Sequence, residues 1–480
     1  MILVCLILIP FVTGALTFAT KGDTAKTIAL ISTIATMALS AYVSASNFSA
    51  PLTYSCPWIP MLGTQFSLLA DGMSSMLCLM TGIVMMVVMI ANANKEVTNA
   101  GSFYGLLLLS QAGLMGVFLA NDAFVFYIFW ELALIPVYFL CSQWGGEKRI
   151  PVTFKFFVYT FVGSLMLLAA LIYLSMQTPG LTSYSWADIT RAGASLSPDK
   201  QQWLFWMVFI AFAIKMPIFP FHTWQPDTYE QSPTPVTIVL SALMVKMGLF
   251  AVLRWLLPTL PAGVAYWSDT VIVLSVIGIV YASCLAIVQT DMKRLIAYSS
   301  IAHMGLMSAV AFAHNGVGMH GIMVQMFNHG INITGMWLIV SMVENRWGTR
   351  DMTKLGGMAS SAPRMAIALV LVSLASIALP LTNGFVGEFM LFNGLIGGTE
   401  ANAITLMVIA GLGIILGAVY TLNMIQKTAY GEKVGMLVAK DLSINEWLGL
   451  AIIISLILFL GVYPKPLLDL TSGVANMIVR

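Results

Sequence analysis

The sequence predicts an all-α polytopic membrane protein, and three observations support this fold class. Of the 480 residues, 59% are hydrophobic and only 9% are charged, a composition that a soluble domain of this length could not hold at its surface. The mean hydropathy is +0.90. Apolar runs of about 20 residues, the length that crosses a bilayer core, follow one another with no long hydrophilic tract between them. We therefore expect a single membrane domain over residues 1–480.

About fourteen spanning helices follow from these runs and from the turn or charge signals that bound them. They are expected at 1–20, 27–46, 68–91, 102–120, 122–143, 152–176, 203–230, 234–257, 268–289, 294–313, 317–343, 364–398, 402–428 and 445–463. The first run lacks the basic n-region of a signal peptide, so we interpret it as a spanning helix. The runs at 203–230 and 364–398 each contain a break.

The orientation follows from the basic residues, because Lys and Arg accumulate in cytoplasmic loops. Alternate loops, beginning after the first helix, hold fourteen of them: Lys21, Lys26, Lys95, Lys148, Arg149, Lys293, Arg294, Arg346, Arg350, Lys354, Arg364, Lys427, Lys433 and Lys440. The opposite loops and the C-terminal tail hold four: Arg191, Lys200, Lys465 and Arg480. With an even number of helices, both termini are predicted on the non-cytoplasmic side.

Several classes of function are disfavoured by what the sequence contains. A net charge of +2 with dispersed basic residues does not suit a nucleic-acid surface. The five cysteines are scattered singly, without the spacing of a metal or Fe–S site. The 32 methionines are interpreted as packing residues between helices, because they form no short repeat. We expect no metal and no redox cofactor in this chain.

Four ionisable residues fall at membrane depth: Glu131, Lys215, Lys246 and Glu388. A charge at the centre of a spanning helix costs about 2.5–3.5 kcal/mol on insertion scales, so such residues persist mainly when they are paired or face a wet path. Static ion pairs that fix helix packing are one explanation. Two acids and two lysines on four different helices favour the other explanation, a path for ions. Lys155 and Arg254 lie close enough to helix ends to snorkel.

Both breaks lie beside one of these charges. Pro217 and Pro220 follow Lys215 and remove backbone donors, which opens the helix near the lysine and frees carbonyls for water or a side chain. Pro380 and Gly384 interrupt a second helix just before Glu388. Two broken helices with an ionisable group each are typical of ion-translocating membrane proteins.

Histidines extend the series of polar residues. His303 and His329 fall within apolar helices, with serine, asparagine and threonine nearby to hydrogen-bond them or to hold water. A lone histidine of this kind is often a satisfied packing residue, but its titration near neutral pH also suits proton transfer. His222 is expected to cap or hydrate the break after Pro220, and Asp227 is a candidate supporting residue.

Seven segments together resemble a known family, the antiporter-like membrane subunits of respiratory complex I. They are FYIFWELALIPVYFL, KFFVYTFVGSLMLLAALIYL, FAIKMPIFPFHTWQPD, LMVKMGLFAVLR, DMKRLIAYSSIAHMG, FNHGINITGMW and NGFVGEFMLF. The likeness runs from about residue 60 to residue 430. Sister subunits and related cation/proton antiporters usually have lysine where this chain has Glu388, which indicates one particular member of the set.

The resemblance implies fourteen helices with two inverted five-helix repeats, at about 102–257 and about 268–430, with flanking helices at 1–91 and 445–463. It implies that helices 7 and 12 are the broken ones. Glu131 and Lys215 would form a coupled pair, Lys246, His303 and His329 a central hydrophilic axis, and Glu388 the terminal proton-loading residue. The chain would work in a bacterial plasma membrane beside other complex I subunits, which would hold FMN, Fe–S clusters and quinone.

The mechanism implied by the resemblance is proton pumping driven by quinone reduction elsewhere in the complex. Moving the charge of Glu131 relative to Lys215 would change how strongly the amine holds its proton, which would pass through Lys246 and the histidines to Glu388. The sequence departs from the family after the first break, where Gln225 and Tyr229 replace a leucine and a second histidine. Two alternatives remain at this stage: an Mrp-type cation/proton antiporter subunit, and a membrane cytochrome with His303 and His329 as haem ligands.

Overall fold

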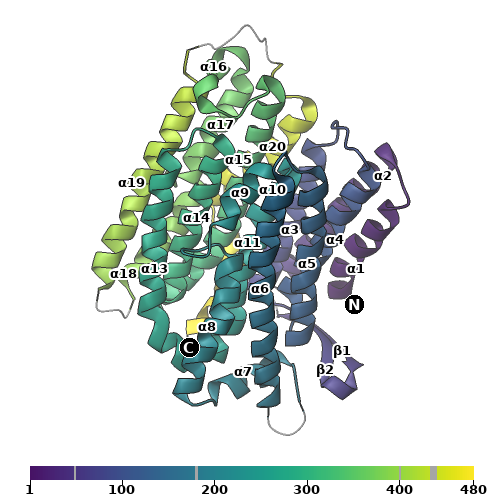
Figure 1. Ribbon diagram of the computed structural model, residues 1–480, viewed down its shortest axis with the longest axis vertical. Coiled ribbons are helices and arrows are strands. Elements are labelled where there is room, and N and C mark those ends of the chain that lie inside the picture. The colour runs from purple at the N-terminus through teal and green to yellow at the C-terminus, as the bar shows by residue number, and fades with distance from the viewer. Residues whose placement is uncertain (48–49, 179–181, 399–401, 433–439, 480) are drawn as a thin grey trace.

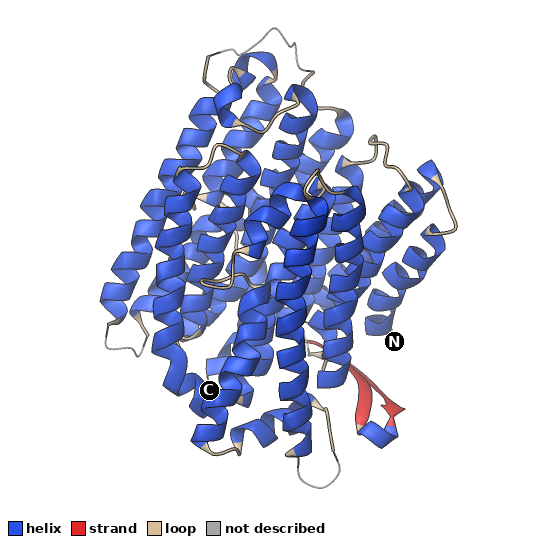
Figure 2. Cartoon of the chain, in the orientation of Figure 1, coloured by secondary structure: helices blue, strands red, loops and turns tan. Residues whose placement is uncertain are grey.

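The computed structural model describes residues 1–47, 50–178, 182–398, 402–432 and 440–479. Most of the described residues are helical, and the helices stand roughly side by side in one bundle (Figures 1 and 2). A two-stranded antiparallel hairpin, β1 (Leu52–Ile59) and β2 (Thr64–Ala70), projects from one end of the bundle. A single 3₁₀ turn, η1 (Pro60–Leu62), joins the two strands.

The N-terminal part of the bundle contains six long helices. They are α1 (Ile2–Thr17), α2 (Gly22–Ser46), α3 (Gly72–Ala91), α4 (Ala100–Leu119), α5 (Ala123–Trp144) and α6 (Arg149–Met176). Asp71 and Asp122 cap α3 and α5, since each carboxylate accepts backbone N–H bonds from the first turn of its helix. α1 and α2 lie at the edge of the bundle in Figure 1.

The middle of the chain contains the most deeply buried stretch of the molecule. It contains α7 (Trp186–Ala194), α8 (Pro198–Lys215) and α9 (Trp224–Gln231), then one continuous stretch made of α10 (Thr234–Ile238), η2 (Val239–Met244), α11 (Val245–Ala251), η3 (Val252–Leu256) and α12 (Leu257–Thr259). The segments η2 and η3 are π-helical. This stretch, Thr234–Thr259, is buried on all sides over its spanning window. A helix surrounded by protein can hold polar groups away from lipid.

The C-terminal part completes the bundle. Its elements are α13 (Pro261–Ile287), α14 (Met292–Ala311), α15 (Gly316–Trp347), η4 (Met352–Lys354), α16 (Met358–Ser361), α17 (Pro363–Ser376), α18 (Asn383–Ile396), α19 (Ala403–Thr428), α20 (Ile444–Val462) and α21 (Lys465–Val479). α15 packs against α3, α14, α17, α18 and α20. It therefore links the early and late parts of the chain.

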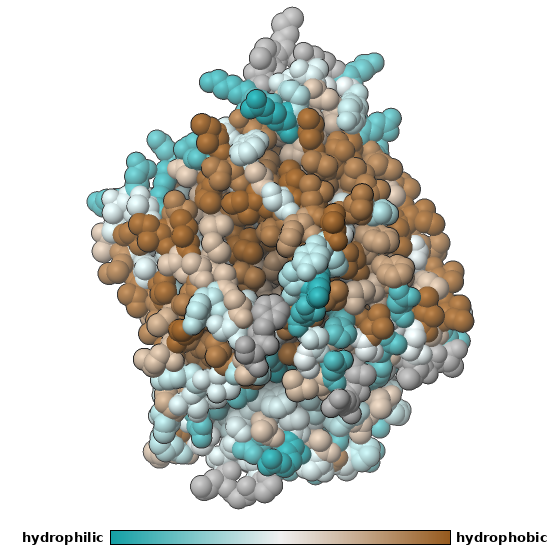
Figure 3. All heavy atoms as spheres, turned by 180° about the vertical axis from the view of Figure 1, so that it is seen from behind, coloured by the Kyte–Doolittle hydropathy of each residue, from teal (hydrophilic) through white to brown (hydrophobic). Residues whose placement is uncertain are grey.

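On the face seen in Figure 3, hydrophobic side chains cover a broad area between more hydrophilic ends. Among the described residues, nine helices are both long enough and apolar enough to cross a bilayer, and α1 and α17 are shorter apolar helices. The prediction of a multi-pass helical membrane protein is therefore confirmed. Lys433 and Arg480, which entered the orientation argument, lie outside the described residues.

Several elements were not expected from the sequence. The hairpin β1–β2 occupies residues that were partly assigned to the helix at 68–91, and α3 begins only at Gly72. The short helix α7 and the C-terminal helix α21 were also missed. Lys293, counted as a loop residue, is 3% exposed and lies in the first turn of α14.

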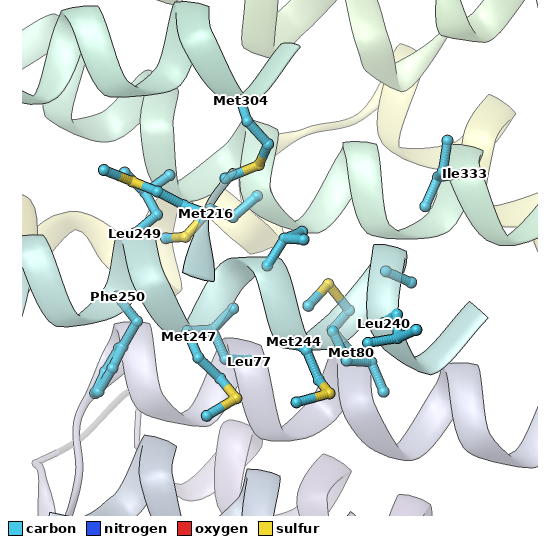
Figure 4. Close-up of a cluster of buried hydrophobic side chains, with 14 of the residues drawn as sticks. Leu77, Met80, Met216, Leu240, Met244, Met247, Leu249, Phe250, Met304 and Ile333 are labelled. Carbon is cyan, nitrogen blue, oxygen red and sulfur yellow. The ribbon is translucent and has the colours of Figure 1, made fainter. Parts of the chain in front are cut away.

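Methionines fill the space between helices in the centre of the molecule. Met244 and Met247 lie on the buried middle stretch and point toward Leu77 and Met80 of α3, while Met216 lies near Leu249 (Figure 4). These six side chains are all buried, and none is more than 2% exposed. An unbranched thioether adapts to irregular gaps, so these contacts support the packing interpretation.

Candidate functional site

The first broken helix ends at Lys215 and resumes at Trp224, with Pro217 and Pro220 between them. The carbonyl of Ala213, which loses its usual donor at Pro217, accepts a bond from the N–H of Ile218 at 3.2 Å. The indole of Trp224 donates to the carbonyl of Ile214 at 3.0 Å. The carbonyl that Pro217 frees is thus satisfied by a backbone donor, and a side chain satisfies its neighbour at Ile214. Lys215 is left at the end of a helix inside the bundle.

Lys215 is 3% exposed, and its Nζ has no hydrogen-bond partner within the part of the chain that the structure describes. The ammonium lies over the ring of Trp130, 5.2 Å from its centroid, a distance at which a ring face attracts a cation. Glu131, the next residue on α5, has a buried Oε1 that likewise lacks a partner among the described residues. No ion pair within 4.0 Å joins the two charges in that same set. Trp130, which sequence reasoning passed over, thus stands beside both.

Lys246 is 0% exposed and lies on α11, just after the π-helical segment η2. Its Nζ donates to the carbonyl of Ser241 at 2.9 Å and lies 2.7 Å from Nδ1 of His329 on α15. A buried ammonium is costly unless such partners satisfy it. The π-helical geometry of η2 coincides with this contact, as π-bulges often do at functional sites.

The contacts of Lys246 continue toward Glu388. The rings of His329 and His303 lie 5.4 Å apart between centroids. Nδ1 of His303, on α14, lies 3.0 Å from Oε1 of Glu388 on α18. We call Lys246, His329, His303 and Glu388 the axial line. Four helices far apart in sequence therefore supply four adjacent ionisable groups, and Lys215 is not in direct contact with them.

Two small cavities border the axial line. One of about 10 Å³ is lined by both histidines and by Gln325 and Asn332. The other, of about 30 Å³, is lined by His303, Glu388 and Tyr420 among others. Volumes of this size admit about one and two water molecules respectively, because one water needs roughly 10–15 Å³ by this measure. The line is therefore able to accommodate water beside its titratable groups.

Tyr420 and Gln325 were missed by sequence reasoning. The hydroxyl of Tyr420, on α19, donates to Oγ of Ser299 at 3.0 Å, and Oε1 of Gln325 is buried without a partner among the described residues. A single tyrosine or glutamine in an apolar helix carries no charge signal. Only the fold shows that both line the cavities next to His303.

The second break separates α17 from α18 at residues 377–382, which include Pro380. Ala378 and Leu381 have φ values of 56° and 73°, a strained region for residues with a side chain. Two asparagines of α15 support the break: Asn328 Nδ2 donates to the carbonyl of Asn383 at 2.7 Å, and Asn332 Nδ2 to that of Ala375 at 3.2 Å. These asparagines were expected to serve the histidines, and the structure places their amides on the backbone.

Gly384, expected at the break, lies instead in the first turn of α18. A Cβ there would come within 2.2 Å of the carbonyl oxygen of Ala375. The glycine is needed because the two halves of the broken helix approach each other closely, and Pro380 alone marks the interruption.

We expect Gly384→Ala to reduce the amount of assembled protein, because overpacking of this kind costs about 1–3 kcal/mol. The measurement is the fraction of the subunit recovered in its complex on a native gel. Gly411→Ala on α19 is the control, since a Cβ there meets nothing within 4 Å. Equal recovery of the two variants would contradict the prediction.

Asp227 and His222 have different surroundings. Asp227 accepts from Lys155 Nζ at 2.9 Å and from Arg294 Nη1 at 3.0 Å, and Arg294 also reaches Glu230 at 2.7 Å. His222 is 3% exposed, stacks on Phe219 and meets Tyr281 edge to face. Asp227 thus belongs to an ion-pair group at the helix end, and the side chain of Lys155, which is 39% exposed, extends to this group as a snorkelling lysine would.

Arg254, by contrast, does not snorkel. Its guanidinium pairs with the carboxylate of Asp71, and both side chains are largely buried. The pair joins η3 to the start of α3. The pairing accounts for the buried guanidinium of Arg254, so this residue needs no role in an ion path.

The histidines do not fit the haem interpretation. His303 and His329 contact each other and use their Nδ1 atoms on Glu388 and Lys246. The cavity that they share is about 10 Å³, far smaller than a macrocycle. Within the described residues, no group of three or more His, Cys, Asp or Glu is arranged to hold a metal ion.

A buried line of amine, imidazole and carboxylate groups in a broken-helix bundle defines an ion-translocating membrane protein. The sequence pattern described as NADH:quinone oxidoreductase/Mrp antiporter, transmembrane, matches residues 120–417, and the chain belongs to this family. NADH-quinone oxidoreductase subunit M of Rickettsia typhi is 35% identical over 94% of this chain and 92% of its own length. Subunit M of Escherichia coli K12 is 32% identical over 99% of this chain and 97% of its own. Glu388 indicated subunit M among the antiporter-like subunits, and these relatives confirm that prediction.

Solved structures agree with this assignment. A chain of respiratory complex I from Thermus thermophilus superposes with a TM-score of 0.91 at 28% identity, over 100% of both chains. A chain of the Mrp complex from Dietzia sp. DQ12-45-1b gives a TM-score of 0.86 at 22% identity, over 98% of this chain and 52% of that one. The second likeness shows a shared fold only.

Proposed function

We propose that the axial line carries protons through this chain, which acts as the antiporter-like, proton-translocating membrane subunit of NADH:quinone oxidoreductase. The observation that supports this most is the contact series Lys246–His329–His303–Glu388, with separations of 2.7 Å and 3.0 Å at its two ends. Groups at hydrogen-bond distance can exchange protons directly, and the two histidine rings, 5.4 Å apart, border a cavity that can hold a water between them. Static packing does not require all four groups. The relatives named NADH-quinone oxidoreductase subunit M support the same function.

We further propose fourteen crossings of the bilayer, with α8 and α9 forming the seventh helix, the stretch from α10 to α12 the eighth, and α17 and α18 the twelfth. Two inverted repeats, at about 102–257 and about 268–430, would then each contain one broken helix. The end of the bundle that carries the Lys- and Arg-rich loops, which we call the basic end, would face the cytoplasm. Both termini would then lie on the opposite side of a bacterial plasma membrane. FMN, Fe–S clusters and quinone would belong to other subunits, and this chain would hold no cofactor.

In this proposal the pair of Glu131 and Lys215 controls the proton of the amine. Lys215 has a ring face as its neighbour and no direct carboxylate contact, so approach of the Glu131 charge would stabilise the ammonium and withdrawal would weaken it. Quinone chemistry elsewhere in the complex would drive that movement. The released proton would pass toward Lys246 and leave through Glu388.

The runner-up function is a cation/proton antiporter subunit, since the matching family also includes Mrp antiporters. We expect NADH-driven proton transport by the complex in proteoliposomes to proceed equally with and without sodium. The measurement is the initial rate of acidification of the lumen, reported by a pH-sensitive dye. Proton movement that needs a sodium gradient and continues without NADH oxidation would favour the antiporter and sink the proposal.

A further inference from the structure

The basic end of the bundle contains a lysine whose position is unlike that of its neighbours. Lys293 lies in the first turn of α14, and its side chain is 4% exposed. Arg294, the next residue, is 29% exposed and holds Asp227 and Glu230 at the surface. Lys293 instead points its ammonium inward, although burying a cation is costly. From the sequence, Lys293 was expected to be one of the basic residues of a cytoplasmic loop. That role does not explain why its side chain is buried.

The ammonium of Lys293 joins a surface carboxylate to the interior. Its Nζ lies 3.7 Å from Oε2 of Glu344, whose side chain is 38% exposed. On the other side Nζ donates to the carbonyl oxygen of Ser232 at 3.2 Å, directly before the buried stretch that begins at Thr234. An ammonium has three donors, so a further donor is available to water.

Hydroxyl groups continue inward from this carbonyl. Oγ1 of Thr237 lies 3.3 Å from the same oxygen of Ser232 and 3.2 Å from the carbonyl oxygen of Pro233, to both of which it can donate. Ser241 lies four residues further on, which is about 6 Å along a helix, and its carbonyl accepts the bond from Lys246 at 2.9 Å. Thr237 and Ser241 are both 0% exposed. Lys293 and Lys246 therefore contact the two ends of one stretch of a buried helix, with the hydroxyls of Thr237 and Ser241 between them.

The hydroxyl of Ser241 distinguishes this series from ordinary helix packing. Buried serine and threonine hydroxyls usually bond a carbonyl of the preceding turn, as Thr428 does with Met424 at 2.7 Å. Oγ of Ser241 is buried and has no hydrogen-bond partner among the described residues. Leaving such a group unsatisfied costs about 1–3 kcal/mol, so its position suits a site where water passes.

We propose that Lys293, Thr237 and Ser241 form the proton-input path from the basic end of the bundle to Lys246. Lys293 passes a proton to water bound at its third donor and regains one from Glu344 or from water at the surface. The proton moves on through water and the two hydroxyls, and it ends on Lys246 when that amine is neutral. Each hydroxyl accepts a proton on one side as it gives one up on the other, so neither changes its net state. This inference rests on the proposed function of Lys246, and it adds the direction from which Lys246 is loaded.

The test uses the complete complex in inverted membrane vesicles. Thr237→Val removes the hydroxyl with little change of shape, Ser241→Ala removes the second, and Lys293→Met removes the amine. We expect each to lower the initial rate of NADH-driven proton uptake, Lys293→Met by about tenfold, which corresponds to ~1.4 kcal/mol in the barrier. Thr237→Ser and Lys293→Arg should recover most of the rate, which a purely structural loss would not predict.

Matched controls lie on other helices. Ser283→Ala on α13 removes another buried hydroxyl without a partner among the described residues, and Thr428→Val on α19 removes one bonded within its own helix. Both should leave proton uptake unchanged. NADH:ferricyanide activity reports how much complex each membrane contains.

Lys246→Met, measured in parallel, distinguishes a failure of the input path from a failure of the axial line. Unchanged uptake in the Lys293, Thr237 and Ser241 variants, with loss in Lys246→Met, would overturn the input path alone. Unchanged uptake in Lys246→Met would overturn the proposed function of the axial line. A loss in Lys293→Met that Lys293→Arg does not recover would also contradict the input path, because it would indicate a packing role.

Discussion

Lys246→Met should assemble into the complex and lose most of its coupled proton transport. The amine is the first member of the axial line, and it contacts both Ser241 and His329. Methionine is similar in length and suits a region that already contains Met244 and Met247 (Figure 4). We expect the rate of NADH-driven proton uptake to fall by at least about tenfold, or ~1.4 kcal/mol in the barrier. Uptake by inverted vesicles, normalised to NADH:ferricyanide activity, is the measurement.

The amine of Lys246 should matter for transport more than for stability. Replacing a buried charge by a well-packed apolar side chain is often neutral or stabilising. Met247→Leu, on the same helix, is the control for a change of packing without a change of charge, and it should pump normally. If Lys246→Met pumps like the Met247 variant, the axial line does not carry protons.

The residues at the centre of the site could be predicted because charge is visible in an apolar sequence. Lys246 and Glu388 interrupt long hydrophobic runs, and the cost of burial identifies them without any knowledge of contacts. Their partners could not be predicted in the same way. His329 lies 83 positions after Lys246, and no periodicity in either helix indicates that their side chains meet.

The start of α3, the π-helical segments and the partner of Arg254 could not be predicted from the sequence. Leu68 and Leu69 made the apolar run at 68–91 appear continuous, although Asp71 caps α3 and the residues before it form a strand. The π-helical segments η2 and η3 have no sequence signature that distinguishes them from an α-helix. Arg254 looked like a snorkelling residue because its partner, Asp71, is far away in the sequence.

The variants Glu131→Ala and Lys215→Ala should each leave assembly largely intact and abolish most coupled activity. Glu131 is only partly buried, and Lys215 lies at a helix end with a ring as its neighbour, so neither truncation breaks a direct ion pair. What each removes is the charge to which the other responds. We expect a loss of about tenfold or more in proton uptake, equivalent to ~1.4 kcal/mol in the barrier. Normal pumping in reconstituted vesicles would contradict the proposed pair.

A double variant shows whether the two charges act as one unit. Groups that work together give a combined loss much smaller than the sum of the single losses, so Glu131→Gln with Lys215→Met should pump about as poorly as either single variant. Trp130→Phe keeps an aromatic face under the ammonium but weakens its attraction, and it should reduce pumping only partly. Additive losses in the double variant would mean that Glu131 and Lys215 contribute separately, and the switch would then have to lie elsewhere along α5 or α8.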